Sequence, residues 1–273
     1  MTSTSPALME GKRGLIMGVA NDRSIAWGIA KMLGQHGADL AFTYQGEAFG
    51  RRVLPLAESV GSDMVLPCDV EDADSLDAVF SALSEKWGKI DFLVHAIAYA
   101  DKEELKGRYA DTSRENFRKA LDISCYSFTD ICRRASAIMP DGGSLATLTF
   151  FGSNRVIPNY NVMGVAKAAL EASVRYLASD LGPQGIRVNA ISPGPMRTLA
   201  GSAIGDARYM YRFNQTHAPL RRTVELQEVG GAGLYLLSDL GSGVTGEIHH
   251  VDAGYNTIGM PRPENLRTNS NGA

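Results

Sequence analysis

The chain has 273 residues, of which 44% are hydrophobic, and a formal net charge of −3. This length can bury one sizeable α/β core, and the near-neutral charge provides no basic stripe for nucleic acid. The three cysteines, Cys68, Cys125 and Cys132, are too few and too scattered for a disulfide framework or a metal site, so we expect no metal. With no secretory signal and no window approaching about 18 consecutive apolar residues, we expect a cytoplasmic protein without a membrane segment.

Short apolar runs alternate with helical patterns along the chain. Strands are expected at residues 14–18, 38–44, 63–69, 90–98, 142–150, 185–194 and 246–254, with helices starting at Ser24, Glu47, Asp74, Ser113 and Tyr160. Near-continuous hydrophobic strands separated by amphipathic segments are typical of a parallel sheet covered on both faces. We therefore predict a single-domain, Rossmann-like doubly wound α/β fold of about seven parallel strands with helices on both faces.

No repeat or linker divides this pattern, which predicts one domain over residues 9–260. Residues 1–8 and 261–273 are expected to be flexible tails. Two long loops, 98–113 and 192–220, follow strand ends at the edge where open α/β sheets bind ligands. The second contains a short helical pattern around residues 207–213 and is expected to cover the substrate.

The first strand leads through a glycine-containing turn into a helix. Gly18 and Gly28 are the outer glycines of this turn, but the middle glycine of G-x-G-x-x-G is missing, and Ser24 can cap the helix. Backbone N–H groups at a helix N-terminus suit a dinucleotide pyrophosphate. A plain tight turn is the alternative interpretation of this segment.

The ends of the second, third and fourth strands supply further candidates. Gln45 stands where an adenosine ribose would lie, and the absence of an arginine immediately after it favours NADH over NADPH. Asp69 could accept from the adenine amino group while Val70 packs on the ring, although Asp69 could equally be a helix N-cap. A lone His95 is interpreted as structural rather than catalytic.

Tyr160 and Lys167 are seven residues apart in one predicted helix. They share a helix face but lie roughly 10 Å apart along its axis. Carbonyl-reducing short-chain reductases need the tyrosine four residues before the lysine, and Met163 holds that place here. The wider spacing suits a reaction in which the charged oxygen is displaced from the carbon that receives hydride. Out of context, these residues would be a buried aromatic and a solvated lysine.

Several motifs together resemble those of a known family. They are Gly18-x5-Ser24-Ile25-Ala26, Cys68-Asp69-Val70, Pro158 to Gly164, Tyr160-x6-Lys167 and Gly194 to Ala200. In them the chain resembles the bacterial NADH-dependent enoyl-acyl-carrier-protein reductases, a branch of the short-chain dehydrogenase/reductase superfamily. The resemblance, over about residues 9–260, implies NADH-dependent reduction of trans-2-enoyl thioesters in fatty acid elongation. It further implies an acyl carrier protein as partner and a homotetramer.

The same resemblance assigns roles to individual residues. It implies Tyr160 and Lys167 as catalytic residues and Ala100, Phe150 and Tyr160 as substrate contacts. The cofactor contacts that it implies are Gly18, Ser24, Ile25, Gln45, Asp69, Val70, Ile97, Lys167, Met196, Arg197, Thr198, Leu199 and Ala200.

One departure from the family bears on the mechanism. Many members have a second active-site tyrosine where this chain has Phe150, so a mechanism with two tyrosines is not expected. Water and Tyr160 both remain candidates for delivering the proton to the α-carbon. Two rival functions are a carbonyl-reducing short-chain dehydrogenase, which would need a tyrosine in place of Met163, and a catalytically silent NAD-binding sensor.

Overall fold

A single parallel sheet organises the chain. The structure, a computed structural model, describes residues 7–199 and 207–262. Seven strands pair in the order β3-β2-β1-β4-β5-β6-β7 and all pairings are parallel. The strands are β1 (Arg13–Met17), β2 (Asp39–Tyr44), β3 (Met64–Pro67), β4 (Phe92–His95), β5 (Gly143–Leu148), β6 (Ile186–Pro193) and β7 (Ile248–Val251). This confirms the predicted doubly wound α/β fold.

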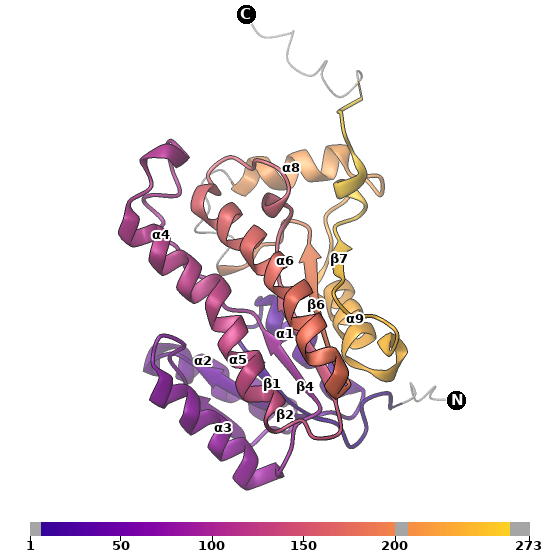
Figure 1. The fold of residues 1–273 in the computed structure, drawn as a ribbon. Coiled ribbons are helices and arrows are strands. Elements are labelled where there is room, and N and C mark those ends of the chain that lie inside the picture. Colours follow the sequence, from indigo (N-terminus) through magenta and orange to yellow (C-terminus); the bar gives the residue numbers. More distant parts are fainter. Residues whose placement is uncertain (1–6, 200–206, 263–273) are drawn as a thin grey trace, which may run out of the picture.

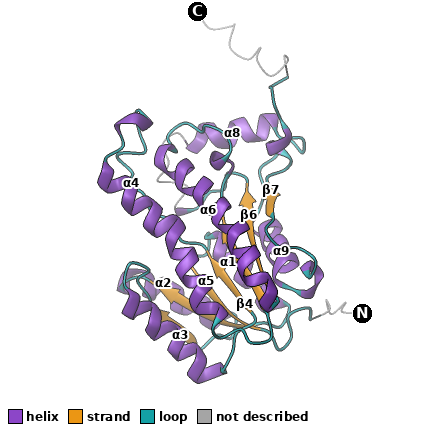
Figure 2. Cartoon of the chain, viewed as in Figure 1, coloured by secondary structure: helices purple, strands orange, loops and turns teal. Residues whose placement is uncertain are grey.

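Helices cover both faces of this sheet (Figures 1 and 2). One face carries α1 (Ile25–Gln35), α2 (Glu47–Ser59) and α9 (Leu226–Leu237), and the other carries α3 (Ala73–Trp87), α5 (Ser127–Ser136) and α6 (Asn161–Leu181). The remaining α-helices of the described chain are α4 (Arg114–Leu121) and α8 (Ala207–His217). None of the helices in the described ranges is long and apolar enough to cross a membrane.

The side chains of the strands pack into two hydrophobic cores, one on each face of the sheet. Leu15 and Met17 of β1 belong to the core under α3, α5 and α6, whereas Ile16 belongs to the core under α1, α2 and α9. This division follows from the two-residue alternation of side chains along a strand. Because both faces are buried, apolar side chains occur on both faces of the strands, although polar residues such as Thr43, His95 and Asn189 interrupt them. Leu8, which the sequence places in the N-terminal tail, packs half-buried against the second core.

Several element boundaries differ from the prediction. Strands β1, β3 and β4 end one to three residues earlier than their apolar runs, at Met17, Pro67 and His95, whereas β2 ends at Tyr44 as predicted. The expected helix from Ser113 continues from α4 through one π-helical segment, Asp122–Tyr126, into α5. Helix α9 was not predicted from the sequence, although Glu225 and Glu228 form a capping box at its start.

Gly28, the second outer glycine of the turn after β1, allows two helices to pack closely. A Cβ at Gly28 would lie 2.9 Å from the backbone oxygen of Leu226, and one at Gly230 would lie 2.7 Å from the oxygen of Gly28. The absence of side chains at both positions therefore lets α1 and α9 approach closely. Gly28 thus supports the turn after β1 indirectly, because it lets α9 pack against α1.

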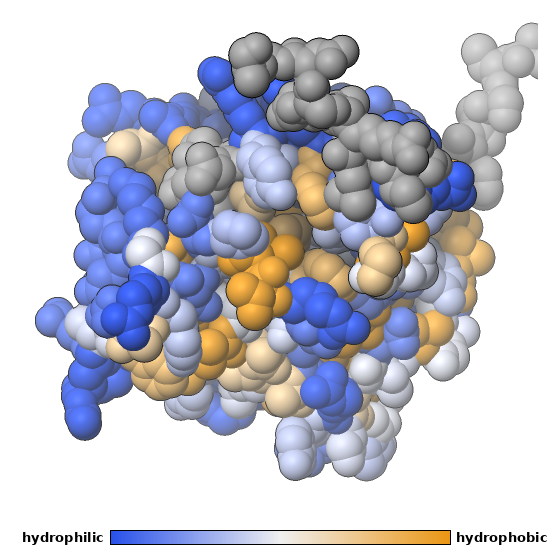
Figure 3. Space-filling model, turned by 90° about the horizontal axis from the view of Figure 1, so that it is seen from above, coloured by the Kyte–Doolittle hydropathy of each residue, from blue (hydrophilic) through white to orange (hydrophobic). Residues whose placement is uncertain are grey.

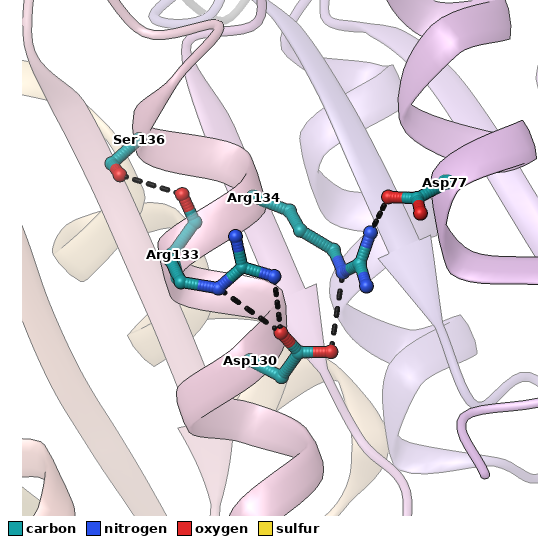
Figure 4. A network of polar contacts seen from close by, with 5 residues as sticks. All are labelled: Asp77, Asp130, Arg133, Arg134 and Ser136. Carbon is teal, nitrogen blue, oxygen red and sulfur yellow. Dashed lines mark hydrogen bonds and ion pairs between the residues drawn. The ribbon is translucent and has the colours of Figure 1, made fainter. Parts of the chain in front are cut away.

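A polar network joins α3 to α5 on the other face (Figure 4). Arg134 of α5 has a side chain only 9% exposed; its Nε donates to Asp130 at 3.1 Å, and its guanidinium also pairs with Asp77 of α3. Arg133 reaches the same Asp130 at 2.8 Å, but its side chain is 68% exposed. Arg134 therefore adds a buried polar link between α3 and α5 to the apolar contacts that the two helices share.

Candidate active site

The candidate residues follow the carboxyl ends of the strands. Gly18 follows β1, Gln45 follows β2, Asp69 follows β3, Ile97 follows β4, and Phe150 follows β5. The strand order reverses between β1 and β4, which is where open α/β sheets form a ligand crevice. Figure 3 looks onto the upper face of the molecule, where apolar side chains gather between polar ones. Neighbouring parallel strands thus bring residues distant in sequence to one edge.

The first turn is held tightly and close to the sheet. Gly18 has φ +98°, and a Cβ there would lie 2.1 Å from the backbone oxygen of Ala96, so only glycine fits. The predicted side-chain cap by Ser24 is wrong. Its Oγ instead accepts from the N–H groups of Ala20 and Asn21, at 2.9 and 3.0 Å. Ser24 consequently shapes the turn and leaves the first N–H groups of α1, beginning at Ile25, without a side-chain cap.

Gln45 and Asp69 meet at the ends of β2 and β3. Gln45 Nε2 donates to Asp69 Oδ2 at 3.1 Å, and Asp69 Oδ1 accepts from the Glu71 N–H at 3.0 Å. Asp69 is not the helix cap, because Asp72 holds that position and accepts from the Asp74 N–H. Val70 packs half-buried against the first core. The structure therefore places an amide and a carboxylate side by side where hydroxyl and amino groups could be bound.

His95 is a structural residue of the sheet. It is fully buried, with Nδ1 3.1 Å from Thr147 Oγ1 and Nε2 2.9 Å from Ser127 Oγ. Burial, together with the charge of Lys167, lowers the pKa of His95 to about 3, so its ring is neutral near pH 7. Beyond it, Ile97 packs half-buried against the first core. The interpretation of His95 as structural agrees with these contacts.

Tyr160 and Lys167 lie at the start of α6, and both are buried. Tyr160 is the N-cap residue and is 6% exposed, as is Lys167. Burial, reinforced by the carboxylate of Glu171, raises the pKa of Tyr160, so its hydroxyl keeps its proton. Lys167 Nζ donates to the Leu148 carbonyl at the end of β5, at 2.8 Å. Burial lowers the pKa of Lys167 to about 8, so the lysine is mostly protonated at pH 7.

The three expected substrate contacts gather in one apolar cluster. Tyr160 and Met163 are buried members of it, and Ala100 and Phe150 pack against it half-buried. The rings of Phe150 and Tyr160 meet edge to face with centroids 5.2 Å apart. Phe150 thus occupies the neighbourhood of Tyr160 with a ring that cannot donate a hydrogen bond.

The segment after β6 contains most of the remaining candidates. Tyr211 of α8 donates to the Met196 carbonyl at 2.7 Å, which also accepts from the Thr198 N–H at 2.9 Å. Arg197 lies with Cζ 5.8 Å from the Tyr211 ring centroid, and Leu199 is 45% exposed. Ala200 lies outside the described residues. A cavity of about 380 Å³ opens here, with a lining that includes Arg23, Met196, Arg197, Tyr211, Gln215 and Glu225.

Helix α8 carries one buried amide without compensation. Asn214 is 2% exposed, and within residues 7–199 and 207–262 neither its Nδ2 nor its Oδ1 has a hydrogen-bond partner. A buried polar group in this state costs free energy.

One residue next to the site, Glu171, was not predicted from the sequence. Glu171 lies one helical turn after Lys167 on α6, is 6% exposed, and accepts from Thr149 Oγ1 at 2.6 Å and from Ser153 Oγ. Its signal in the sequence is a charged residue between Leu170 and Val174, both fully buried. A carboxylate on an apolar helix face requires partners from elsewhere in the fold.

The residues at the carboxyl ends of the strands and on α6 fit a dinucleotide. The Gly18 turn brings the N-terminus of α1 to the sheet edge, the Gln45–Asp69 pair lies two strands away, and Lys167 presents a cation at the start of α6. Within the described segments, His, Cys, Asp and Glu side chains form no group of three or more that could hold a metal ion.

Comparison with known proteins agrees with this geometry. Residues 18–256 match the family model described as enoyl-(acyl carrier protein) reductase. Enoyl-[acyl-carrier-protein] reductase [NADH] 2 of Rhizobium meliloti is 66% identical over 260 residues, covering 95% of this chain and 97% of the relative.

Two solved structures extend the comparison. The reductase of Anaplasma phagocytophilum, in complex with NAD, superimposes with a TM-score of 0.91 at 56% identity, covering 96% of this chain and 98% of that one. The Bacillus cereus enoyl-acyl carrier protein reductase, with NADP⁺ and an indole naphthyridinone, gives a TM-score of 0.91 at 50% identity, covering 93% and 99%. The fold, the arrangement at the strand ends and these similarities together show that the chain belongs to the enoyl-acyl-carrier-protein reductase family.

Proposed function

We propose that Tyr160 is the hydrogen-bond donor in an NADH-dependent reduction of the trans-2 double bond of enoyl thioesters, the fatty acid elongation step catalysed by this family. The observation that carries the assignment is the buried Tyr160 beside Phe150 at the start of α6, with Met163 where a carbonyl reductase needs its tyrosine. Met163 is buried and cannot donate a proton. This favours the enoyl reductase over a carbonyl-reducing relative.

Tyr160 would act on the charge that develops during the reaction. When bound, NADH supplies the hydride that adds to the β-carbon. Negative charge then develops on the thioester oxygen, and the protonated Tyr160 hydroxyl is preplaced to donate to it. Such a preorganised donor is worth roughly 10²–10³-fold in rate. Phe150 and Ala100 would line the acyl chain next to the donor.

Lys167 would hold the cofactor rather than the substrate. Its ammonium is buried and anchored on the Leu148 carbonyl, so its remaining N–H groups are oriented for ribose hydroxyls. Gly18, Ser24, Ile25 and the segment Met196 to Ala200 would surround the pyrophosphate and nicotinamide. Gln45, Asp69, Val70 and Ile97 would contact the adenosine.

The partner and the assembly follow from the same proposal. The substrate would arrive on an acyl carrier protein, as the names of the relatives indicate for those proteins. A homotetramer acting in the cytoplasm completes the proposal, and the predicted tails are residues 1–8 and 261–273. Residues 1–6 and 263–273 of these tails lie outside the described residues.

Turnover of a crotonyl thioester tests this function. Loss of NADH absorbance with crotonyl thioester, and none with acetoacetyl thioester, is expected. Turnover of the acetoacetyl compound alone would identify a carbonyl reductase. Absence of turnover with both would leave the NAD-binding sensor.

Cofactor choice gives a second test. Gln45 is neutral and paired with Asp69, so a 2′-phosphate would meet a carboxylate rather than an arginine. We expect kcat/KM with NADH to exceed that with NADPH clearly, and Gln45→Arg to narrow the difference. Equal kcat/KM values with NADH and NADPH in the unchanged enzyme would contradict this role of Gln45. The measurement is informative because the Bacillus cereus relative was solved with NADP⁺.

A further inference from the structure

Glu171 is a buried carboxylate next to the site that the proposed mechanism does not use. Both of its oxygens accept hydrogen bonds, and all donors come from one short segment between β5 and α6. Thr149 Oγ1 and Ser153 Oγ donate to Oε1, and Asn154 Nδ2 donates to Oε2 at 3.2 Å. Residues 17 to 22 positions earlier in the chain are thereby tied to the middle of the helix.

The tied segment forms one wall around Tyr160. Phe150, between the donors Thr149 and Ser153, meets the Tyr160 ring edge to face at 5.2 Å. Gly152 lies directly against the ring, because a Cβ there would be 2.4 Å from Tyr160 Cδ1. A shift of this segment would therefore move both surfaces on which the Tyr160 ring rests.

The backbone around Tyr160 needs such support. Asn159 and Asn161 have φ values of +58° and +34°, so both neighbours of Tyr160 are in the left-handed region. A non-glycine residue in this region is disfavoured, even though Asn tolerates it better than most, and it persists where surrounding contacts maintain it. On the side of the loop after β4, Asn161 Nδ2 donates to the carbonyls of Glu104 and Gly107 at 3.4 and 3.3 Å. These are long hydrogen bonds, so this loop holds the backbone around Tyr160 weakly.

We propose that Glu171 is a positioning residue that fixes the Thr149–Asn154 segment and thereby aims the Tyr160 hydroxyl at the substrate. The proposal rests on the proposed donor role of Tyr160. Glu171 touches neither substrate nor cofactor in this role, and it acts through Phe150 and Gly152. The preceding turn of the same helix is anchored separately, by Lys167 on Leu148.

Glu171→Gln tests the proposal with little change in side-chain shape. A glutamine presents an N–H₂ group where Glu171 has an acceptor, so at least one of the three donors loses its partner. We expect kcat to fall about 10- to 100-fold, because a small misplacement of a reacting group lowers the rate by about this factor. The dissociation constant of NADH, measured by protein fluorescence at pH 6.5 where Lys167 is protonated, should change less than about threefold.

A double-mutant cycle with Tyr160→Phe separates positioning from general damage. If Glu171 acts through Tyr160, Glu171→Gln should lower kcat less than about twofold when Tyr160→Phe is already present. Asp180→Asn, at an exposed position of the same helix, is the control for losing a negative charge and should leave kcat unchanged. Ser153→Ala removes one of the donors and should give a smaller, equally coupled loss, so it carries the test if Glu171→Gln does not fold.

The outcomes are distinguishable. Equal losses in both backgrounds, or wild-type kcat in the folded Glu171→Gln variant, would overturn the role of Glu171 and leave Tyr160 as donor. If Glu171→Gln does not fold, wild-type kcat in Ser153→Ala would overturn it as well. Wild-type kcat in Tyr160→Phe alone would remove the donor role and this proposal with it.

Discussion

At the scale of single residues, Tyr160 and Lys167 divide the work along one helix. Tyr160→Phe removes the donor and should lower kcat with a crotonyl thioester about 10- to 10³-fold with little effect on NADH affinity. Lys167→Ala should instead weaken NADH binding. Tyr176→Phe, on the same helix but 76% exposed, is the control and should behave as wild type. Unchanged kcat in Tyr160→Phe would mean that another group donates to the oxygen.

The charge of Lys167 should make NADH binding depend on pH. Burial lowers the pKa of this lysine from 10.5 to about 8, so its charge is lost as the pH rises through 8. NADH affinity should therefore decline above about pH 8, and Lys167→Arg, which stays charged, should bind without that decline. Titration of NADH fluorescence from pH 6.5 to 10 measures both.

Unfolding does not explain such a decline. The folded pKa of Lys167 lies below the unfolded one, so the unfolded chain binds more protons between pH 8 and 10.5. The contribution of this group to stability therefore rises with pH in that window. A melting temperature that falls in step with NADH affinity would contradict the assignment to Lys167.

At the scale of elements, the packing of α3 on α5 depends on Arg134 (Figure 4). Arg134→Met removes bonds to Asp77 and Asp130 from a side chain that is 9% exposed, and should lower the free energy of unfolding by about 2 kcal/mol. Arg133→Met removes an exposed pair to the same Asp130 and should cost less than about 1 kcal/mol. Urea unfolding of both variants measures the difference, and equal losses would mean that burial of Arg134 adds nothing.

At the scale of the whole molecule, His95 should make the fold sensitive to acid. Burial lowers its pKa from 6.5 to about 3, so the unfolded chain binds one more proton than the folded chain between these values. The free energy of unfolding should therefore fall with pH below 6.5, by about 1.4 kcal/mol per unit from this group.

His95→Gln tests this effect. The variant should be less stable at pH 7, because it loses contacts to Thr147 and Ser127, yet its stability should fall less steeply with acid. Urea unfolding between pH 4.5 and 6.5 gives the two slopes. Equal slopes would assign the acid sensitivity to other groups.

The sequence predicted which residues form the candidate site, but not the hydrogen bonds among them. Tyr160 and Lys167 were predicted from their spacing in one helix, and Phe150 and Ala100 from the resemblance to the family. The partners of Glu171 and the turn of Ser24 were not, because a side chain's choice among nearby donors depends on where the neighbouring backbone lies. The pairing of Gln45 with Asp69 likewise depends on the register of β2 against β3.

The class of fold, the seven strands and the family could all be predicted without the structure. Apolar runs long enough to be buried on both faces require a parallel sheet with helices on each side, and the spacing of Tyr160 and Lys167 is a property of one helix. Three features required the folded chain: Asp72 rather than Asp69 caps α3, α9 packs on α1 through Gly28 and Gly230, and Glu171 binds the segment beside Tyr160. These contacts join residues distant in the chain, and hydrophobic periodicity reports only which side of an element is buried, not which partner buries it.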